Sequence, residues 1–173
     1  QAGALQALSE IADFDATPFR VLTGVSAGAI NAAYLASHAD DFRAATRTLW
    51  DVWQGLGAQQ VFRSDAPNLI GIGTRWIRDL AMGGVLEGGN INYLLDTSPL
   101  RTYLGDRLQL ERAREHVASG RLRGFAVSAT SYLTGTAISF FDAAPEVREW
   151  ARSTRIGLRA HVRLEHVLAS AAI

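Results

Sequence analysis

A serine between two glycines is the feature of this chain that most directly suggests chemistry. The stretch Gly24-Val25-Ser26-Ala27-Gly28 has the Gly-X-Ser-X-Gly spacing of a nucleophile elbow, a sharp strand-to-helix turn that exposes a serine hydroxyl. We expect both glycines to be required, because a side chain at either position would crowd the strand–helix contact or an incoming acyl group. Ser26 is therefore a candidate nucleophile for acyl transfer, with the Ala27 N–H as a candidate oxyanion donor.

The segments on either side of this motif have the patterns that an elbow needs. Residues 19–23 form a short apolar run, which is typical of a buried strand. Residues 27–37 carry five alanines and predict a helix that lies close to a sheet. The alternative is that Ser26 only caps this helix, since serine is a preferred N-cap residue. We favour the nucleophile, because an N-cap does not need a glycine on each side.

Composition indicates an ordinary globular domain. The chain has 173 residues, of which 48% are hydrophobic, and 17 basic residues balance 17 acidic ones. The zero net charge gives no electrostatic basis for binding nucleic acid, and the absence of cysteine excludes disulfides and thiolate metal sites. Gly71-Ile72-Gly73 lacks the third glycine and the preceding strand of a dinucleotide-binding loop. We therefore predict neither a cofactor nor a metal.

Both ends of the sequence lie within helical patterns. Residues 1–8 are already helical in pattern and do not begin with methionine, and residues 166–173 end without a C-cap. We interpret residues 1–173 as one domain that is truncated at both ends. We also expect that these residues alone are not a competent catalyst.

The remaining segments predict an α/β fold. Helical spacing of apolar residues and helix-start signals predict further helices over 40–54, 67–82, 97–104 and 108–118. Strands are predicted over 125–130 and 137–141, joined as a hairpin through Thr134-Gly135, and more weakly near 156–158. For residues 67–86 we favour an amphipathic core helix over an apolar wall for acyl chains or a membrane-contacting flap.

A serine nucleophile needs a base, and four histidines are candidates. His38 ends the helix after the elbow, where a cation suits the helix dipole. His116 lies in a charge-rich segment, which predicts that it is solvated. His161 and His166 flank the start of the last helix. None of the four has a local motif, so we favour structural roles for all of them.

Two other functions stay open. An α/β-hydrolase esterase would use Ser26, Asp142 and either His161 or His166 as a Ser-Asp-His triad, in the correct chain order. Against this, that fold places several strands before its elbow, whereas only 25 residues precede Ser26. A non-enzymatic module would instead bind a nucleotide or a partner through phosphate at the helix N-terminus.

The chain resembles the patatin-like phospholipase family. Its elbow and the small, Asn-containing helix after it, Gly24 to Ala33, are similar to the family's elbow. Residues 1–8 resemble the helix that follows the family's Gly-rich oxyanion loop, and residues 127–135 resemble its central strand and hairpin. Residues 168–173 are similar to the segment just before the family's catalytic aspartate motif.

This resemblance implies a three-layer α/β/α fold with a central, mostly parallel sheet. It also implies a serine acyl hydrolase of phospholipase or esterase type, in which Ser26 is the nucleophile of a Ser-Asp dyad. The aspartate and the main oxyanion loop would then lie outside residues 1–173, and Asp142 is the alternative acid within them. The implied partner is a lipid or acyl-ester substrate, and peripheral contact with a membrane stays open. Lipid class, oligomeric state and compartment are not determined by these residues.

Overall fold

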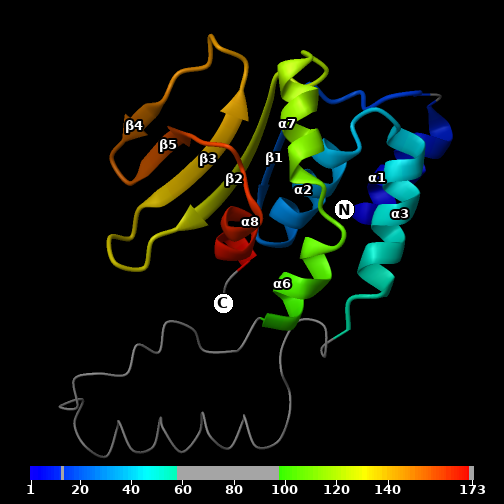
Figure 1. The fold of residues 1–173 in the computed structure, drawn as a ribbon, viewed down its shortest axis with the longest axis horizontal. Helices are drawn as coiled ribbons and strands as arrows, with labels where there is room; N and C mark the ends of the chain where they lie inside the picture. Colours follow the sequence, from blue (N-terminus) through cyan, green and yellow to red (C-terminus); the bar gives the residue numbers. More distant parts are fainter. Residues whose placement is uncertain (13, 58–97, 172–173) are drawn as a thin grey trace, which may run out of the picture.

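A mixed five-stranded β-sheet is the centre of the fold (Figure 1). The structure is a computed structural model that describes residues 1–12, 14–57 and 98–171. The strands lie in the order β1 (Val21–Val25), β2 (Gly124–Thr130), β3 (Ala137–Ala143), β5 (Arg155–Arg159) and β4 (Trp150–Arg152). β1 pairs with β2, and β3 with β5, in parallel, whereas the β2–β3 and β4–β5 pairs are antiparallel.

Helices pack around this sheet as the sequence predicts for an α/β fold. The described helices are α1 (Ala2–Ile11), α2 (Ala27–Ser37), α3 (Phe42–Gln54), α6 (Ser98–Gly105), α7 (Leu110–Ala118) and α8 (Leu164–Ala171). α2 lies against β1 and β2, α8 lies against β2, and α1 packs on α3 (Figure 1). The predicted α/β class, with a central sheet and a strand–turn–helix at Ser26, is confirmed.

Most predicted elements are found, with two differences in the strands. The strand before Ser26 runs over Val21–Val25 rather than 19–23, so it continues to the residue next to the serine. The prediction that this strand is buried is wrong, because Leu22 is its only buried residue and both valines are exposed. The short edge strand β4 was not predicted, because three residues carry too little alternation to stand out. The predicted helix over 67–82, the alternatives for 67–86 and the Gly71–Gly73 segment lie outside the described residues.

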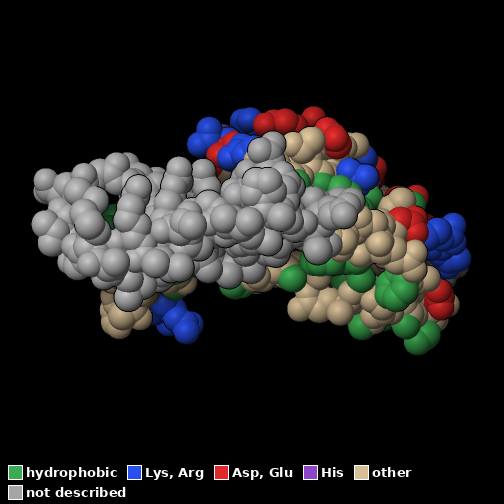
Figure 2. All heavy atoms as spheres, turned by 90° about the horizontal axis from the view of Figure 1, so that it is seen from below, with side chains coloured by type: hydrophobic (Ala, Val, Ile, Leu, Met, Phe, Trp, Pro, Cys, Tyr) green, Lys and Arg blue, Asp and Glu red, His purple; other side chains and the backbone are tan. Residues whose placement is uncertain are grey.

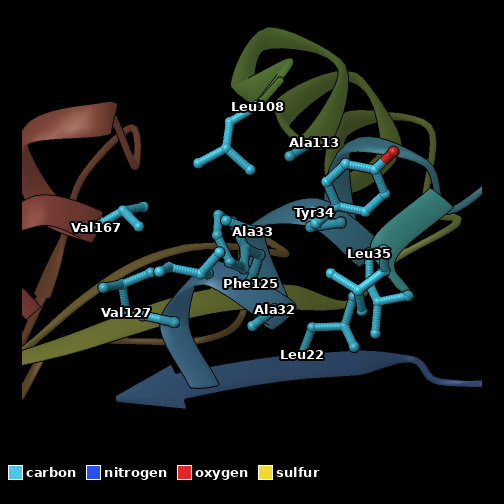
Figure 3. Close-up of a cluster of buried hydrophobic side chains, with 14 of the residues drawn as sticks. Leu22, Ala32, Ala33, Tyr34, Leu35, Leu108, Ala113, Phe125, Val127 and Val167 are labelled. Carbon is cyan, nitrogen blue, oxygen red and sulfur yellow. The ribbon is translucent and has the colours of Figure 1, made fainter. Parts of the chain in front are cut away.

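The hydrophobic core lies between the sheet and α2. Leu22 of β1 and Phe125 and Val127 of β2 point toward the alanines of α2, and Val167 of α8 closes the core on one side (Figure 3). Nearly the whole of α2 from Ala29 onward is buried. Its small side chains explain this position, because alanine lets a helix approach a sheet closely at no cost in helix propensity.

Polar contacts stabilise the start of α3 and join α3 to α1. Asp41 caps α3 by accepting a hydrogen bond from the Ala44 N–H at 2.9 Å. The buried hydroxyl of Thr46 on α3 donates to that of Ser9 on α1 at 2.9 Å. Both hydroxyls are therefore satisfied although they are buried between the two helices.

His116 is buried, and the prediction that it is solvated is wrong. It lies on the inner face of α7 beside Ala113 and Val117, both buried, so the charges of this helix belong to its other face. Its Nε2 is 3.3 Å from Oδ1 of Asp40. Burial, together with the nearby charge of Arg112, lowers the pKa of His116 below 6.5 against the opposing effect of Asp40.

This burial predicts a loss of stability in mild acid. Since the folded-state pKa of His116 lies below its unfolded value, its contribution is complete above about pH 6.5. It is lost as the pH falls below that value, with a slope of at most about 1.4 kcal/mol per pH unit for one histidine. We expect His116→Gln to reduce the slope of unfolding free energy against pH, measured by urea denaturation between pH 8 and 5. An unchanged slope in this variant would contradict the assignment.

Charged side chains on the described surface are mixed in sign. Figure 2 shows the molecule from below the view of Figure 1, and acidic and basic side chains lie intermingled along the upper and right margins of the described part. This distribution agrees with the zero net charge of the sequence. In the described ranges, no helix has the length and apolar composition that a bilayer crossing requires.

Candidate active site

Ser26 occupies the sharp turn between β1 and α2 in a strained conformation. Its φ is 53° and its ψ is −128°, a region that costs a non-glycine residue about 1–3 kcal/mol. The residue is exposed, and its hydroxyl makes no capping hydrogen bond to α2. The alternative that the Ser26 side chain serves only as an N-cap is therefore wrong. A strained, exposed serine whose hydroxyl does not cap the following helix is typical of a nucleophile elbow.

The backbone of Ser26 is held by Ser170, a residue of α8. The N–H of Ser26 donates to Oγ of Ser170 at 2.9 Å, and this hydroxyl donates in turn to the carbonyl of Ser128 at 2.6 Å. Ser170 is only 8% exposed, so this bridge is shielded from water. It ties the elbow to β2 and α8 and helps to hold the strained conformation in place.

No sequence signal identified Ser170 as part of the site. It lies in an alanine-rich helix, where a serine has many ordinary roles, and its partner is 144 residues away in the chain. The resemblance of residues 168–173 to a family segment marked the region but gave no role to this hydroxyl.

We expect Ser170→Ala to reduce turnover as well as stability. The change leaves the Ser26 N–H and the Ser128 carbonyl without their partner, which costs about 1–3 kcal/mol of unfolding free energy. A looser elbow should also lower kcat by about 10-fold or more with little change in KM, because misplacement of the nucleophile affects the transition state. Ester hydrolysis and thermal unfolding measure the two effects.

Ser139→Ala is a matched control for this change. Oγ of Ser139 shares a 2.7 Å hydrogen bond with Oγ of Ser128 on the same sheet, without touching Ser26. It should cost stability but leave kcat unchanged, and Ser170→Thr, which keeps a hydroxyl, should recover part of the lost turnover. Equal kcat losses for Ser170→Ala and Ser139→Ala would show that Ser170 has a merely structural role.

The two elbow glycines differ in how much space surrounds them. A Cβ on Gly24 would lie 2.0 Å from the carbonyl oxygen of Gly28, which is backbone and cannot move aside cheaply. Among the described residues, a Cβ on Gly28 would meet only Oε1 of Gln1, at an ordinary 3.8 Å. The prediction that a Cβ at Gly28 crowds the strand–helix contact is therefore wrong. Gly24 is the glycine that this contact requires.

The N-terminal end of α2 provides hydrogen-bond donors beside the serine. The first N–H groups of a helix have no acceptor within the helix, and here they belong to Ala27 and Gly28. The carbonyl of Ser26 already accepts the Ala29 N–H at 2.8 Å, so the turn is closed and these donors are fixed. Together with the positive end of the helix dipole, they favour a negative charge near Ser26.

A groove of about 640 Å³ borders the elbow between α1, β1 and α2. Its apolar lining includes Leu5, Leu8, Leu22 and Leu35. The lining also includes Val25 and Gly28, which precede and follow Ser26 in the chain. A volume of this size lies within the range of small-molecule sites.

A buried asparagine fixes the polar side of this groove. Nδ2 of Asn31 donates to Oε1 of Gln1 at 2.6 Å, and its Oδ1 accepts from Nε1 of Trp53 at 2.6 Å. The Asn31 side chain therefore joins α2 to α3 and to Gln1, the N-cap residue of α1. The helices that form the wall of the groove are positioned by this pair of hydrogen bonds as well as by apolar packing.

The strand register separates Asp142 from Ser26. Asp142 pairs with Phe125, which pairs with Leu22, and Leu22 lies at the start of β1 whereas Ser26 follows its end. At about 3.3 Å per residue and 4.8 Å per strand, the two residues are roughly 16 Å apart. Asp142 instead lies beside His161, with its Oδ2 3.3 Å from Nδ1 of the histidine. The structure therefore brings two members of the predicted triad together, but away from the serine.

His166 and His38 have structural contacts. Nδ1 of His166 accepts the Arg163 N–H at 3.0 Å at the start of α8, and its ring stacks on Phe140 at 4.4 Å between centroids. His38 follows α2, and its Nδ1 lies 3.0 Å from the carbonyl of Tyr34. No described histidine or carboxylate forms a hydrogen bond with the Ser26 hydroxyl.

These contacts predict that the histidines are not the general base. We expect His161→Gln and His166→Gln each to lower kcat/KM for ester hydrolysis by less than about tenfold, whereas loss of a general base costs about 100-fold or more. Circular dichroism should confirm that both variants fold. A collapse of activity in either folded variant would favour the Ser-Asp-His alternative.

Similarity to known proteins covers the residues of this site. A family model described as patatin-like phospholipase matches residues 1–173, which is the whole chain. No curated protein and no solved structure matches it. The matched range includes the elbow, the central strands and α8, so the family similarity and the site geometry concern one region.

Proposed function

We propose that this chain, which belongs to the patatin-like phospholipase family, hydrolyses lipid esters with Ser26 as its nucleophile. Membership of the family supports lipid hydrolase activity in general. The observation that carries the assignment of Ser26 is its conformation, with a φ of 53° at a strand–helix turn and an exposed hydroxyl that caps nothing. Backbone strain of this kind is found at active sites, where surrounding contacts must maintain it.

The reaction begins with attack of the Ser26 hydroxyl on the ester carbonyl. A base takes the hydroxyl proton as the oxygen–carbon bond forms, and the carbonyl oxygen becomes an oxyanion. In this proposal, the Ala27 N–H and the positive end of the α2 dipole stabilise the oxyanion. The intermediate then expels the alcohol, which takes the proton from the base. Water attacks the acyl-serine in the second half, releasing the fatty acid and restoring the serine.

The base in this proposal is an aspartate outside residues 1–173, as the family resemblance implies. The position of Asp142 supports this choice, because it lies roughly 16 Å from Ser26 by strand register. The resemblance likewise places the main oxyanion donors in a Gly-rich loop outside these residues. The loss of one such donor typically costs about 100-fold or more in rate.

The groove beside the elbow supports an apolar acyl group as the part of the substrate nearest Ser26. Its four leucines come from α1, β1 and α2, and Gly28 leaves room at the point where the groove meets the serine. An acyl chain that lies in this groove would place its carbonyl carbon at the elbow. The head group of the lipid is not specified by these residues.

Labelling by a fluorophosphonate tests the proposal directly. The complete gene product should react with this probe, and mass spectrometry should find the adduct on the peptide that contains Ser26. Reaction requires an activated serine, so a phosphate-binding module without catalysis would not be labelled. An adduct on another serine, or no adduct in a protein that hydrolyses esters, would overturn the assignment.

A further inference from the structure

The end of the sheet that carries Ser26 also carries two exposed turns. β1 ends beside Ser128 of β2, and the β2–β3 turn, residues 131–136, follows at the same end (Figure 1). β3 and β5 both begin there, because Ala137 pairs with Arg155, so the β4–β5 turn, residues 153–154, lies there too. We call this end of the sheet, formed by Ser26 and the two turns, the elbow edge.

The β2–β3 turn presents two large apolar side chains to solvent. Tyr132 is 84% exposed and Leu133 is 98% exposed. The turn is closed by hydrogen bonds of 2.9 Å from the Ser131 N–H to the Thr136 carbonyl and of 2.8 Å from the Gly135 N–H to the Ser131 carbonyl. Hydrogen bonds between the strands continue the same hairpin. The two side chains are thus held outward by a closed turn.

The hairpin is also free of charge from its turn up to Phe141 of β3. No Asp, Glu, Lys or Arg occurs between Arg123 and Asp142. β2 continues two residues past Ser128, the partner of Val25, which is about 7 Å at 3.3 Å per residue, so the turn that carries Leu133 lies beyond the end of β1. An uncharged hairpin with an aromatic and an aliphatic residue at its tip can enter the interfacial region of a lipid layer without desolvating an ion.

Two arginines flank the neighbouring β4–β5 turn, one at the end of β4 and one at the start of β5. Arg152 and Arg155 are directly opposite each other in an antiparallel pair, and both are exposed. Within the part of the chain that the structure describes, neither side chain has an ion-pair or hydrogen-bond partner. Like charges at opposite positions of two strands repel each other. An anionic surface against this turn would relieve the repulsion and attract both guanidinium groups.

We propose that the elbow edge docks on an anionic phospholipid surface, with Tyr132 and Leu133 entering the interface and Arg152 and Arg155 contacting lipid phosphates. The proposal deepens the proposed function, on which it rests for the lipid substrate, by naming the surface that delivers the lipid. Two observations at the same end of the sheet support it. The β2–β3 turn exposes two apolar side chains, and two arginines without a described ion-pair partner lie beside it. Docking in this way brings the end of the sheet that carries Ser26 toward the lipid layer.

Vesicle binding without catalysis tests this proposal. The complete gene product with Ser26→Ala should sediment with phosphatidylglycerol vesicles more than with phosphatidylcholine vesicles. Adding Tyr132→Ser and Leu133→Ser should weaken binding to both by about tenfold or more, because the apolar insertion is lost. Adding Arg152→Gln and Arg155→Gln instead should weaken only the binding to phosphatidylglycerol, by about tenfold or more.

Ile11 offers a matched control. It is 84% exposed at the end of α1, so Ile11→Ser removes equally exposed apolar surface from another element and should leave vesicle binding unchanged. Leu133→Trp should strengthen binding, an effect of opposite sign that does not depend on a loss of folding. Binding that is insensitive to the tip and arginine variants, or equally weakened by Ile11→Ser, would overturn the proposal.

Activity with Ser26 restored separates the two proposals. The tip and arginine variants should hydrolyse a soluble short-chain ester at the normal rate and phosphatidylglycerol vesicles more slowly. If the protein binds vesicles through the elbow edge but hydrolyses neither substrate, the docking proposal stands and the proposed function is wrong. If all of these variants hydrolyse vesicles at the normal rate, the proposed function stands and the docking proposal is wrong.

Discussion

Ser26→Ala is expected to reduce hydrolysis of p-nitrophenyl esters by the complete gene product by about a thousandfold or more, since the nucleophile of the covalent step is removed. Its effect on folding should be small. The hydroxyl makes no capping bond and is exposed, so we expect the unfolding free energy to change by less than about 1 kcal/mol. Steady-state kinetics and urea denaturation measure the two quantities.

Two further variants make this test sharper. Ser26→Gly should be equally inactive yet at least as stable as Ser26→Ala, because glycine accepts a φ of 53° without strain. Ser119→Ala removes a hydroxyl from the exposed end of α7, where it donates only to the His116 carbonyl, and should leave activity unchanged. Hydrolysis at the normal rate by purified Ser26→Ala would show that another residue is the nucleophile.

Gly24→Ala is expected to cost about 3 kcal/mol or more of unfolding free energy, or to prevent folding altogether. The new Cβ would lie 2.0 Å from the Gly28 oxygen and 2.5 Å from the Ala29 nitrogen, so β1 and α2 would have to separate. That movement would also displace Ser26, and activity should fall together with stability. Expression yield, thermal unfolding and ester hydrolysis report these effects.

Gly28→Ala is the matched control for the same motif. Its Cβ would have ordinary contacts, and alanine favours a helix by about 1 kcal/mol over glycine. We therefore expect Gly28→Ala to be as stable as the unchanged protein or slightly more stable. If Gly28→Ala is the damaging change and Gly24→Ala folds normally, the close approach of β1 to α2 at the elbow is not as described.

The elbow and its helix were predictable because their signals are local. The spacing of Gly24, Ser26 and Gly28 and the alanines of residues 27–37 lie within one short stretch, and the structure places α2 over Ala27–Ser37 as expected. The strands at 125–130 and 137–141 were predictable for the same reason, since alternation and turn residues act between near neighbours. The family resemblance depends largely on the same stretches.

What the sequence could not show depends on contacts between distant segments. The hydrogen bond from Ser26 to Ser170 spans 144 residues, and a serine among alanines gives no sign of its partner. His116 is buried because of where α7 packs, whereas its own neighbours in the chain are charged.

The sequence by itself determined that a strand, a serine turn and an alanine-rich helix follow one another, because each of these depends on interactions within a few residues. Only the tertiary structure decided which groups meet at that turn. The register of β2 and β3 sets Asp142 apart from Ser26, and the approach of α2 to β1 makes Gly24, rather than Gly28, the glycine without room for a side chain. Strand register and helix packing are set by the burial of side chains from the whole chain, and no single segment carries that information.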